Sequence, residues 1–172
     1  MTERTDAIVV GVDGSEASVS ALRWAAEQAR NLGTSVLAVH AWERVPAAGY
    51  APYAPTAARP TAADQRERAA ELLASAVRAA IGPRTGPDLH AVVEEGPPAW
   101  VLLRHARGAR LLALGRRAHA QWELPAIGAV GRECLRHATV PVVTVPAGER
   151  HATATPELHS VGASRAVRSG AA

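Results

Sequence analysis

The 172-residue sequence contains no lysine, no phenylalanine, one cysteine, and no hydrophobic run long enough to span a membrane. The single Cys134 excludes an intramolecular disulfide, and the opening residues MTERTD lack the apolar core of a signal peptide. We therefore expect a cytoplasmic protein with no membrane partner. Because Cys134 falls within an apolar helical stripe, we expect a packed side chain and not a nucleophile.

Aromatic residues make up only 3% of the chain, and its basic residues are 19 scattered arginines. Proteins that bind nucleic acids usually cluster their positive charge and interleave it with aromatic side chains. The formal net charge of +3 is therefore weak evidence for such a role, and we expect no specific nucleic-acid partner. The use of arginine alone, together with abundant alanine, indicates a compositional bias instead.

The sequence also lacks the motifs that usually carry catalysis or bind metals. It has no Gly-Lys-Ser/Thr phosphate loop and no nucleophile elbow. Its His, Cys and Asp residues do not recur at metal-ligand spacing, so we expect no metal site made of protein ligands. His40, within an apolar run, is better explained as a core histidine with a hydrogen-bond partner. We therefore expect a binding protein and not an enzyme.

The length fits one domain with a sizeable core. We assign residues 1–146 to it, including a long proline- and alanine-rich loop at about 43–60. Loops of this length are commonly functional lids or disordered segments, and both interpretations stay open. Residues 147–172 are rich in alanine, threonine, serine and glycine and carry too few apolar residues to fold, so we expect a disordered tail.

Apolar runs of strand length alternate with amphipathic helical stretches along the domain. The expected strands are 7–12, 35–41, 89–94, 111–114 and 142–145, and the expected helices are 16–32, 61–81, 98–107 and 128–138. This alternation is typical of a doubly wound α/β fold, in which a parallel sheet is covered by helices on both faces. In such sheets ligands bind at the carboxyl ends of the strands, where the strand order reverses.

Two segments carry polar or glycine residues at the end of an expected strand. Asp13-Gly14-Ser15 follows the first apolar run, and Ser15 is suited to cap the next helix. Asp13 is either a helix-entry turn residue or a carboxylate that faces a ligand. Gly115 ends the fourth run, and Gly128 and Gly131 bracket the start of the last helix, a pattern that can seat an anion at a helix amino terminus.

Together these segments resemble the universal stress protein family over about residues 5 to 146. The matching stretches are IVVGVDGSEAS, VLAVHAW, EEGPPAWVLLRHA, LLALGRR and GAVGRECLRHATVPVVTV. The resemblance implies a Rossmann-like fold related to the adenine nucleotide alpha-hydrolases, with five parallel strands in the order 3-2-1-4-5. In that order Asp13 and Gly115 would meet at the switch point of the sheet.

The resemblance also implies a stress-response role, an ATP site with magnesium, and a homodimer. Backbone groups of the second strand would contact adenine, Asp13 would approach the ribose or its metal, and a glycine-rich loop and helix would line the phosphates. The implied nucleotide-binding residues are Asp13, Val39, His40, Ala41, Gly115, Arg117, Ala118, Gly128, Ala129 and Val130. The homodimer would form through the last strand, at Val142, Val143, Thr144 and Val145.

The chain departs from the family's nucleotide motif at two of its four positions. That motif is Gly, two residues, Gly, nine residues, Gly, then Ser or Thr; here its positions are Gly115, Ala118, Gly128 and Ala129. Gly131 also stands where a second serine is common in the family. Ala118 adds a methyl group at a cost of about 1 kcal/mol where the backbone needs a glycine conformation. Ala129 removes a hydroxyl whose hydrogen bond to a charged phosphate would contribute roughly 1.5 to 3 kcal/mol.

Two functions therefore stay open. The substitutions favour an interaction module that has lost most of its nucleotide affinity. The alternative is an ATP-binding protein in which Arg116, Arg117 and His119 compensate, with slow hydrolysis as a further option. A dedicated hydrolase of the related folds would need a serine- and glycine-rich loop after the first strand, which Asp13-Gly14-Ser15-Glu16 does not provide.

Overall fold

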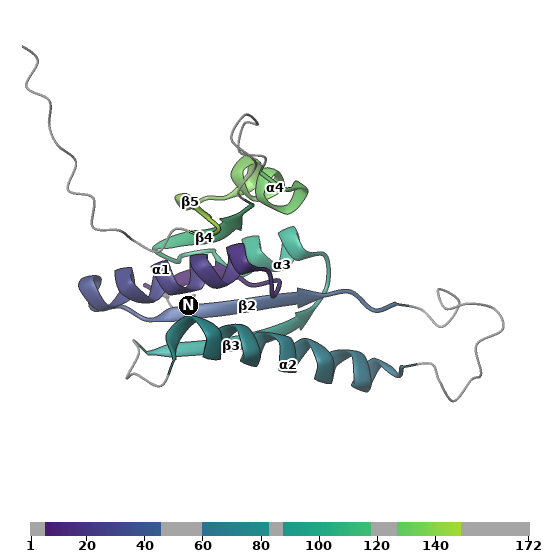
Figure 1. The fold of residues 1–172 in the computed structure, drawn as a ribbon. Helices are drawn as coiled ribbons and strands as arrows, with labels where there is room; N and C mark the ends of the chain where they lie inside the picture. Colours follow the sequence, from purple (N-terminus) through teal and green to yellow (C-terminus); the bar gives the residue numbers. More distant parts are fainter. Residues whose placement is uncertain (1–5, 46–59, 83–87, 118–126, 149–172) are drawn as a thin grey trace, which may run out of the picture.

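The computed structural model describes residues 6–45, 60–82, 88–117 and 127–148. Its centre is a five-stranded parallel sheet in the order β3-β2-β1-β4-β5 (Figure 1). The strands are β1 (Ile8–Gly11), β2 (Val36–Trp42), β3 (Leu89–Glu95), β4 (Leu111–Arg116) and β5 (Val142–Pro146). The predicted α/β class and strand order are confirmed. β5 lies at one edge of the sheet, and its pairing with a second copy stays a prediction.

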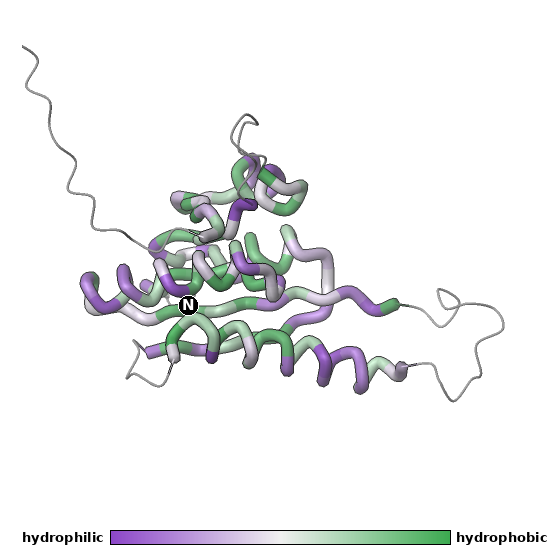
Figure 2. Tube along the Cα trace, in the orientation of Figure 1, coloured by the Kyte–Doolittle hydropathy of each residue, from purple (hydrophilic) through white to green (hydrophobic). Residues whose placement is uncertain are grey.

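Four helices cover the two faces of the sheet. They are α1 (Glu16–Leu32), α2 (Ala62–Ile81), α3 (Pro98–His105) and α4 (Ala129–His137). Helices α1 and α2 share one buried core cluster with the strands, and α3 and α4 share the other. Figure 2 shows hydrophilic residues along the outer side of α2 and hydrophobic residues toward the sheet. The doubly wound architecture therefore follows from helices that each bury one apolar stripe.

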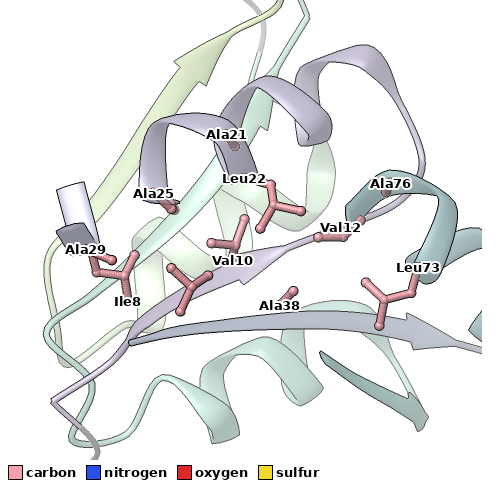
Figure 3. Close-up of a cluster of buried hydrophobic side chains, with 12 residues drawn as sticks. Ile8, Val10, Val12, Ala21, Leu22, Ala25, Ala29, Ala38, Leu73 and Ala76 are labelled. Carbon is pink, nitrogen blue, oxygen red and sulfur yellow. The ribbon is translucent and has the colours of Figure 1, made fainter. Parts of the chain in front are cut away.

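Strand β1 is buried on both of its faces, as its continuous apolar run predicts. Ile8 and Val10 point toward α1 and α2, where they join Leu22 and Leu73 (Figure 3). Val9 points to the opposite face and joins the cluster under α3 and α4. β1 therefore contributes side chains to both core clusters of the domain.

Both long helices, α1 and α2, begin with side-chain capping contacts, and the one expected at Ser15 is confirmed. The Ser15 hydroxyl accepts a hydrogen bond of 3.2 Å from the backbone N–H of Ser18, and α1 ends at Gly33 in the left-handed conformation, with φ at 64°. Thr61 and Asp64 form a reciprocal capping box at the start of α2. Local chemistry thus sets where both long helices begin, and for α1 it places the Ser15 turn directly after β1.

Helix α4 is attached to the protein through a narrower contact than its apolar stripe predicts. Cys134 is fully buried, but Val130 and Leu135 are 36% and 46% exposed. Successive helix positions differ by about 100°, so Leu135 turns away from the surface that receives Cys134. The prediction that Cys134 is a packed residue is confirmed, and the other large apolar residues of α4 are partly exposed.

The cysteine gives a direct test of this packing. Burial, followed by the negative charge of Glu133, raises the pKa of the Cys134 thiol to about 11. Since the thiolate is the reactive form, we expect a thiol reagent at pH 8 to label the folded protein at least about tenfold more slowly than the urea-unfolded chain. The signal is unambiguous because the chain has one cysteine. Equal rates in the two states would show that α4 does not dock as described.

Residues on both sides of the 46–59 stretch are held by one side chain. The Gln65 amide accepts a hydrogen bond from the backbone N–H of Val45 at 2.9 Å and donates to the carbonyls of Val45 and Pro60 at 3.2 and 3.4 Å. The described ends of the predicted loop therefore meet at the start of α2. Residues 46–59 of that loop, and the tail from residue 149 onward, lie outside the described residues.

Candidate functional site

A cavity of about 480 Å³ opens at the carboxyl ends of β1 and β4. Asp13 follows β1, Gly115 belongs to β4, and both line this cavity, so the predicted meeting of the two strand ends is confirmed as geometry. The predicted site residues that line it are Asp13, Val39, Ala41, Gly115, Arg117, Gly128, Ala129 and Val130. His40 is not among the lining residues, and Ala118 and His119 lie outside the described part of the chain.

Asp13 serves the helix-entry turn and also borders the cavity. Its Oδ1 accepts hydrogen bonds from the backbone N–H and the hydroxyl of Ser15, at 3.0 and 2.5 Å. Burial raises the pKa of the Asp13 carboxyl, but the hydrogen bonds from Ser15 outweigh this effect and hold the pKa below its ordinary value. The carboxylate is therefore ionised at neutral pH. The two sequence interpretations of Asp13 are compatible, since one oxygen is enough for the turn.

Strand β2 separates its side chains between the two faces of the sheet. Val39 and Ala41 line the cavity, whereas the ring of His40 points to the other face and places Nδ1 2.7 Å from the carbonyl oxygen of Val12. A carbonyl only accepts, so Nδ1 carries the proton. The expected hydrogen-bond partner of His40 is confirmed, but its side chain is half-buried and does not belong to the core. A contact between its backbone and adenine stays a prediction.

Gly115 is required by packing at the strand end. A Cβ atom there would lie 2.3 Å from the backbone carbon of Ala17 and 2.6 Å from the backbone nitrogen of Ser18. The first turn of α1 therefore rests directly on the end of β4, and no side chain can stand between them. This close approach brings Asp13 and Ser15 to the same cavity wall as Gly115. Gly115 therefore shapes the site through packing. The phosphate motif in the sequence does not indicate this role.

The amino terminus of α4 forms the opposite wall of the cavity. Gly128, its capping residue, has no side chain to occupy the first N–H groups, and a Cβ atom added there would meet nothing within 4 Å. At Gly131, by contrast, a Cβ atom would lie 2.6 Å from Cγ2 of Ile127. The exposed N–H groups and the helix dipole favour an anion here. Ile127 fills the space that a serine at position 131 would need.

The cavity is positively charged. Among its described lining residues, three are arginines and only Asp13 is acidic. Arg116 and Arg117 were candidates from the sequence, but Arg132 was missed. Its Nη1 donates a hydrogen bond of 3.0 Å to the carbonyl of Ile127, which holds the guanidinium beside the start of α4. Side chains on a helix point toward its amino terminus. An arginine four residues after Gly128 could therefore have been predicted to reach the start of α4.

Two further properties concern only the residues that the structure describes. No three or more His, Cys, Asp and Glu side chains gather there where they could hold one metal ion. None of the helices in these ranges combines the length and apolar character needed to cross a membrane. The cytoplasmic location stays a prediction.

Comparison with known proteins places the sequence and the fold in one family. The model of the universal stress protein family matches residues 5–146. A universal stress protein of Mycolicibacterium smegmatis is 32% identical over 143 residues, which cover 80% of this chain and 45% of the relative. The chain thus matches less than half the length of this curated relative.

Solved structures agree with this relation. A universal stress family protein of Burkholderia pseudomallei is 26% identical, with a TM-score of 0.60 and coverage of 86% of this chain and 100% of that chain. A universal stress protein of Archaeoglobus fulgidus, in complex with dAMP, is also 26% identical, with a TM-score of 0.55 and coverage of 80% and 95%. The family match spans the whole described sheet and the cavity at its switch point, and the chain therefore belongs to the universal stress protein family.

Proposed function

We propose that this protein binds an adenine nucleotide in the cavity between β1, β4 and α4, and that it acts in the stress response through binding and not through turnover. The observation that carries the proposal is a cavity of about 480 Å³ at the switch point, with three arginines and one aspartate. The dAMP complex of the Archaeoglobus fulgidus relative supports the same class of ligand.

The walls of the cavity differ in polarity and charge, and each suits the base, the ribose or the phosphates of a nucleotide. On the β2 side, Val39 and Ala41 offer an apolar surface for a base. Asp13, near the centre, offers a carboxylate oxygen that a ribose hydroxyl can reach as a donor. On the β4 and α4 side, backbone N–H groups and guanidinium groups suit phosphates. The ligand would therefore lie across the ends of the central strands.

Magnesium would enter with the phosphates of ATP. Asp13 is the sole acidic side chain among the described lining residues, and one carboxylate leaves most of the coordination shell to phosphate oxygens and water. This chemistry fits a weakly held ion that accompanies ATP. We infer that Asp13 supports the ion without forming a site that holds it in the absence of nucleotide.

An interaction module without nucleotide is the second candidate, and Ala129 is the observation that favours it. This first residue of α4 lines the cavity but supplies no hydroxyl to a phosphate. The three arginines are stronger evidence than the missing hydroxyl. Their guanidinium groups repel one another around the cavity, and a bound anion would relieve this repulsion. We therefore favour a site that retains its ligand with reduced affinity.

Calorimetric titration with ATP and magnesium tests the proposal. We expect a dissociation constant near or below about 100 µM, which corresponds to a binding free energy of about −5.5 kcal/mol. Gly128→Val should weaken binding because the branched side chain would occupy the open space before α4. Thr139→Val, an exposed position outside the cavity, is the control. No heat at millimolar ATP would favour the nucleotide-free module, and phosphate release during the titration would contradict binding without turnover.

A further inference from the structure

The geometry points to Arg132 as the residue that selects for the phosphates of the ligand, in place of the hydroxyl groups that positions 129 and 131 lack. This inference rests on the proposed function and adds a ligand preference to it. The protein's affinity for a nucleotide should therefore rise with the number of phosphates. A nucleoside triphosphate or diphosphate would bind more tightly than a monophosphate or a free nucleoside.

The first support is the hydrogen bond that places the guanidinium of Arg132 beside the start of α4. Arg132 lies in the second turn of α4, and its backbone N–H donates to the carbonyl of Gly128 at 3.0 Å. Its side chain runs back along the helix, where Nη1 donates to the carbonyl of Ile127 at 3.0 Å. One of the five N–H donors makes that bond, and a guanidinium has further donors for a second acceptor. The group is therefore held at the cavity wall with donors to spare.

The second support is the absence of hydroxyl donors in the first turn of α4, just before Arg132. Ala129 and Gly131 carry no hydroxyl, and a side chain at position 131 would require the Ile127 side chain to move. The Ile127 side chain fills the space at position 131 while its carbonyl orients Arg132. One residue thus removes the space for one phosphate donor and positions another.

The third support is the contrast with the other charged residues of α4. Arg136 lies one turn further on and is 3.5 Å from Glu133, with an exposed side chain that does not line the cavity. Arg132 lines the cavity together with Arg116 and Arg117. One guanidinium group can donate to two phosphate oxygens at once. Each added phosphate therefore offers further acceptors to Arg132, Arg116 and Arg117.

The test compares two matched variants of the full chain, Arg132→Ala and Arg136→Ala. ATP, ADP, AMP and adenosine are titrated into each variant and into the wild type, and circular dichroism melting checks that all three fold. We expect Arg132→Ala to weaken ATP binding by about 10- to 100-fold, the range for one hydrogen-bonded charge pair. Adenosine binding should change by less than about twofold, and Arg136→Ala should bind all ligands like the wild type.

The outcomes separate this inference from the proposed function. If the wild type binds ATP and both variants bind it equally, Arg132 does not select phosphate, although the nucleotide site stands. If Arg132→Ala loses adenosine as strongly as ATP, the residue supports the shape of the site and the inference is wrong. If the wild type binds none of the four ligands, both the inference and the proposed function fail.

Discussion

Replacing Gly115 with alanine is expected to lower the free energy of unfolding by about 3 kcal/mol, at the upper end of the usual effect of overpacking. The added Cβ would lie 2.3 Å from the backbone carbon of Ala17. A backbone atom cannot move aside as a flexible side chain can, so relief requires α1 to shift away from β4. Such a shift would also move Ser15 and Asp13, and the cavity would lose its shape.

Urea unfolding and thermal melting measure this effect. For a chain of this size, a loss of about 3 kcal/mol corresponds to a fall in melting temperature of roughly 6 to 12 °C. Gly128→Ala is the matched control, because that position has φ at −60° and nothing within 4 Å of an added Cβ. It should change stability by less than about 0.5 kcal/mol. Equal melting temperatures for the two variants would contradict the close contact between α1 and β4.

Restoring a hydroxyl with Ala129→Ser is expected to raise the affinity for ATP about tenfold or more. Position 129 is the first residue of α4 and lines the cavity. A serine there can donate to a phosphate oxygen, and a hydrogen bond to a charged group contributes roughly 1.5 to 3 kcal/mol. The side chain at position 129 is exposed, so the substitution leaves the core unchanged. Gly131→Ser would be a poorer test because of Ile127.

Parallel titrations of ATP and adenosine into the variant and the wild type would measure the gain. The affinity for ATP should rise while that for adenosine stays the same, since only the phosphates meet the new hydroxyl. Ala74→Ser is the control, an exposed alanine on α2 outside the cavity. If Ala129→Ser binds ATP no better than Ala74→Ser, the phosphates do not lie against the start of α4.

Much of the fold could be predicted because its signals are local. The run Ile8–Gly11 is apolar without alternation, which is typical of a strand buried on both faces, and β1 is such a strand. Ser15 and Gly33 mark the two ends of α1 through capping chemistry that acts within a few residues. The order of the strands came from resemblance to a family, since local patterns do not determine which strands pair.

The site was predicted less completely because it depends on contacts between distant segments. Gly115 was interpreted as part of a phosphate loop, but its nearest obstacle to a side chain is Ala17, about two-thirds of the domain away in sequence. Val39 and His40 are adjacent in the chain, yet they face opposite sides of the sheet. Arg132 was missed because it lies on α4 and not in the loop after β4 that contains Arg116 and Arg117. Only the packed structure relates these positions to one cavity.

The hydrogen bonds of Gln65 have a consequence for engineering. A single amide bridges Val45 and Pro60, so the chain leaves the body after β2 and returns before α2 at nearly the same point. Because Val45 and Pro60 lie close together, the segment between them is a suitable place to insert another sequence. A fluorescent reporter whose own termini lie close together could be inserted between these residues while the strands and helices keep their places.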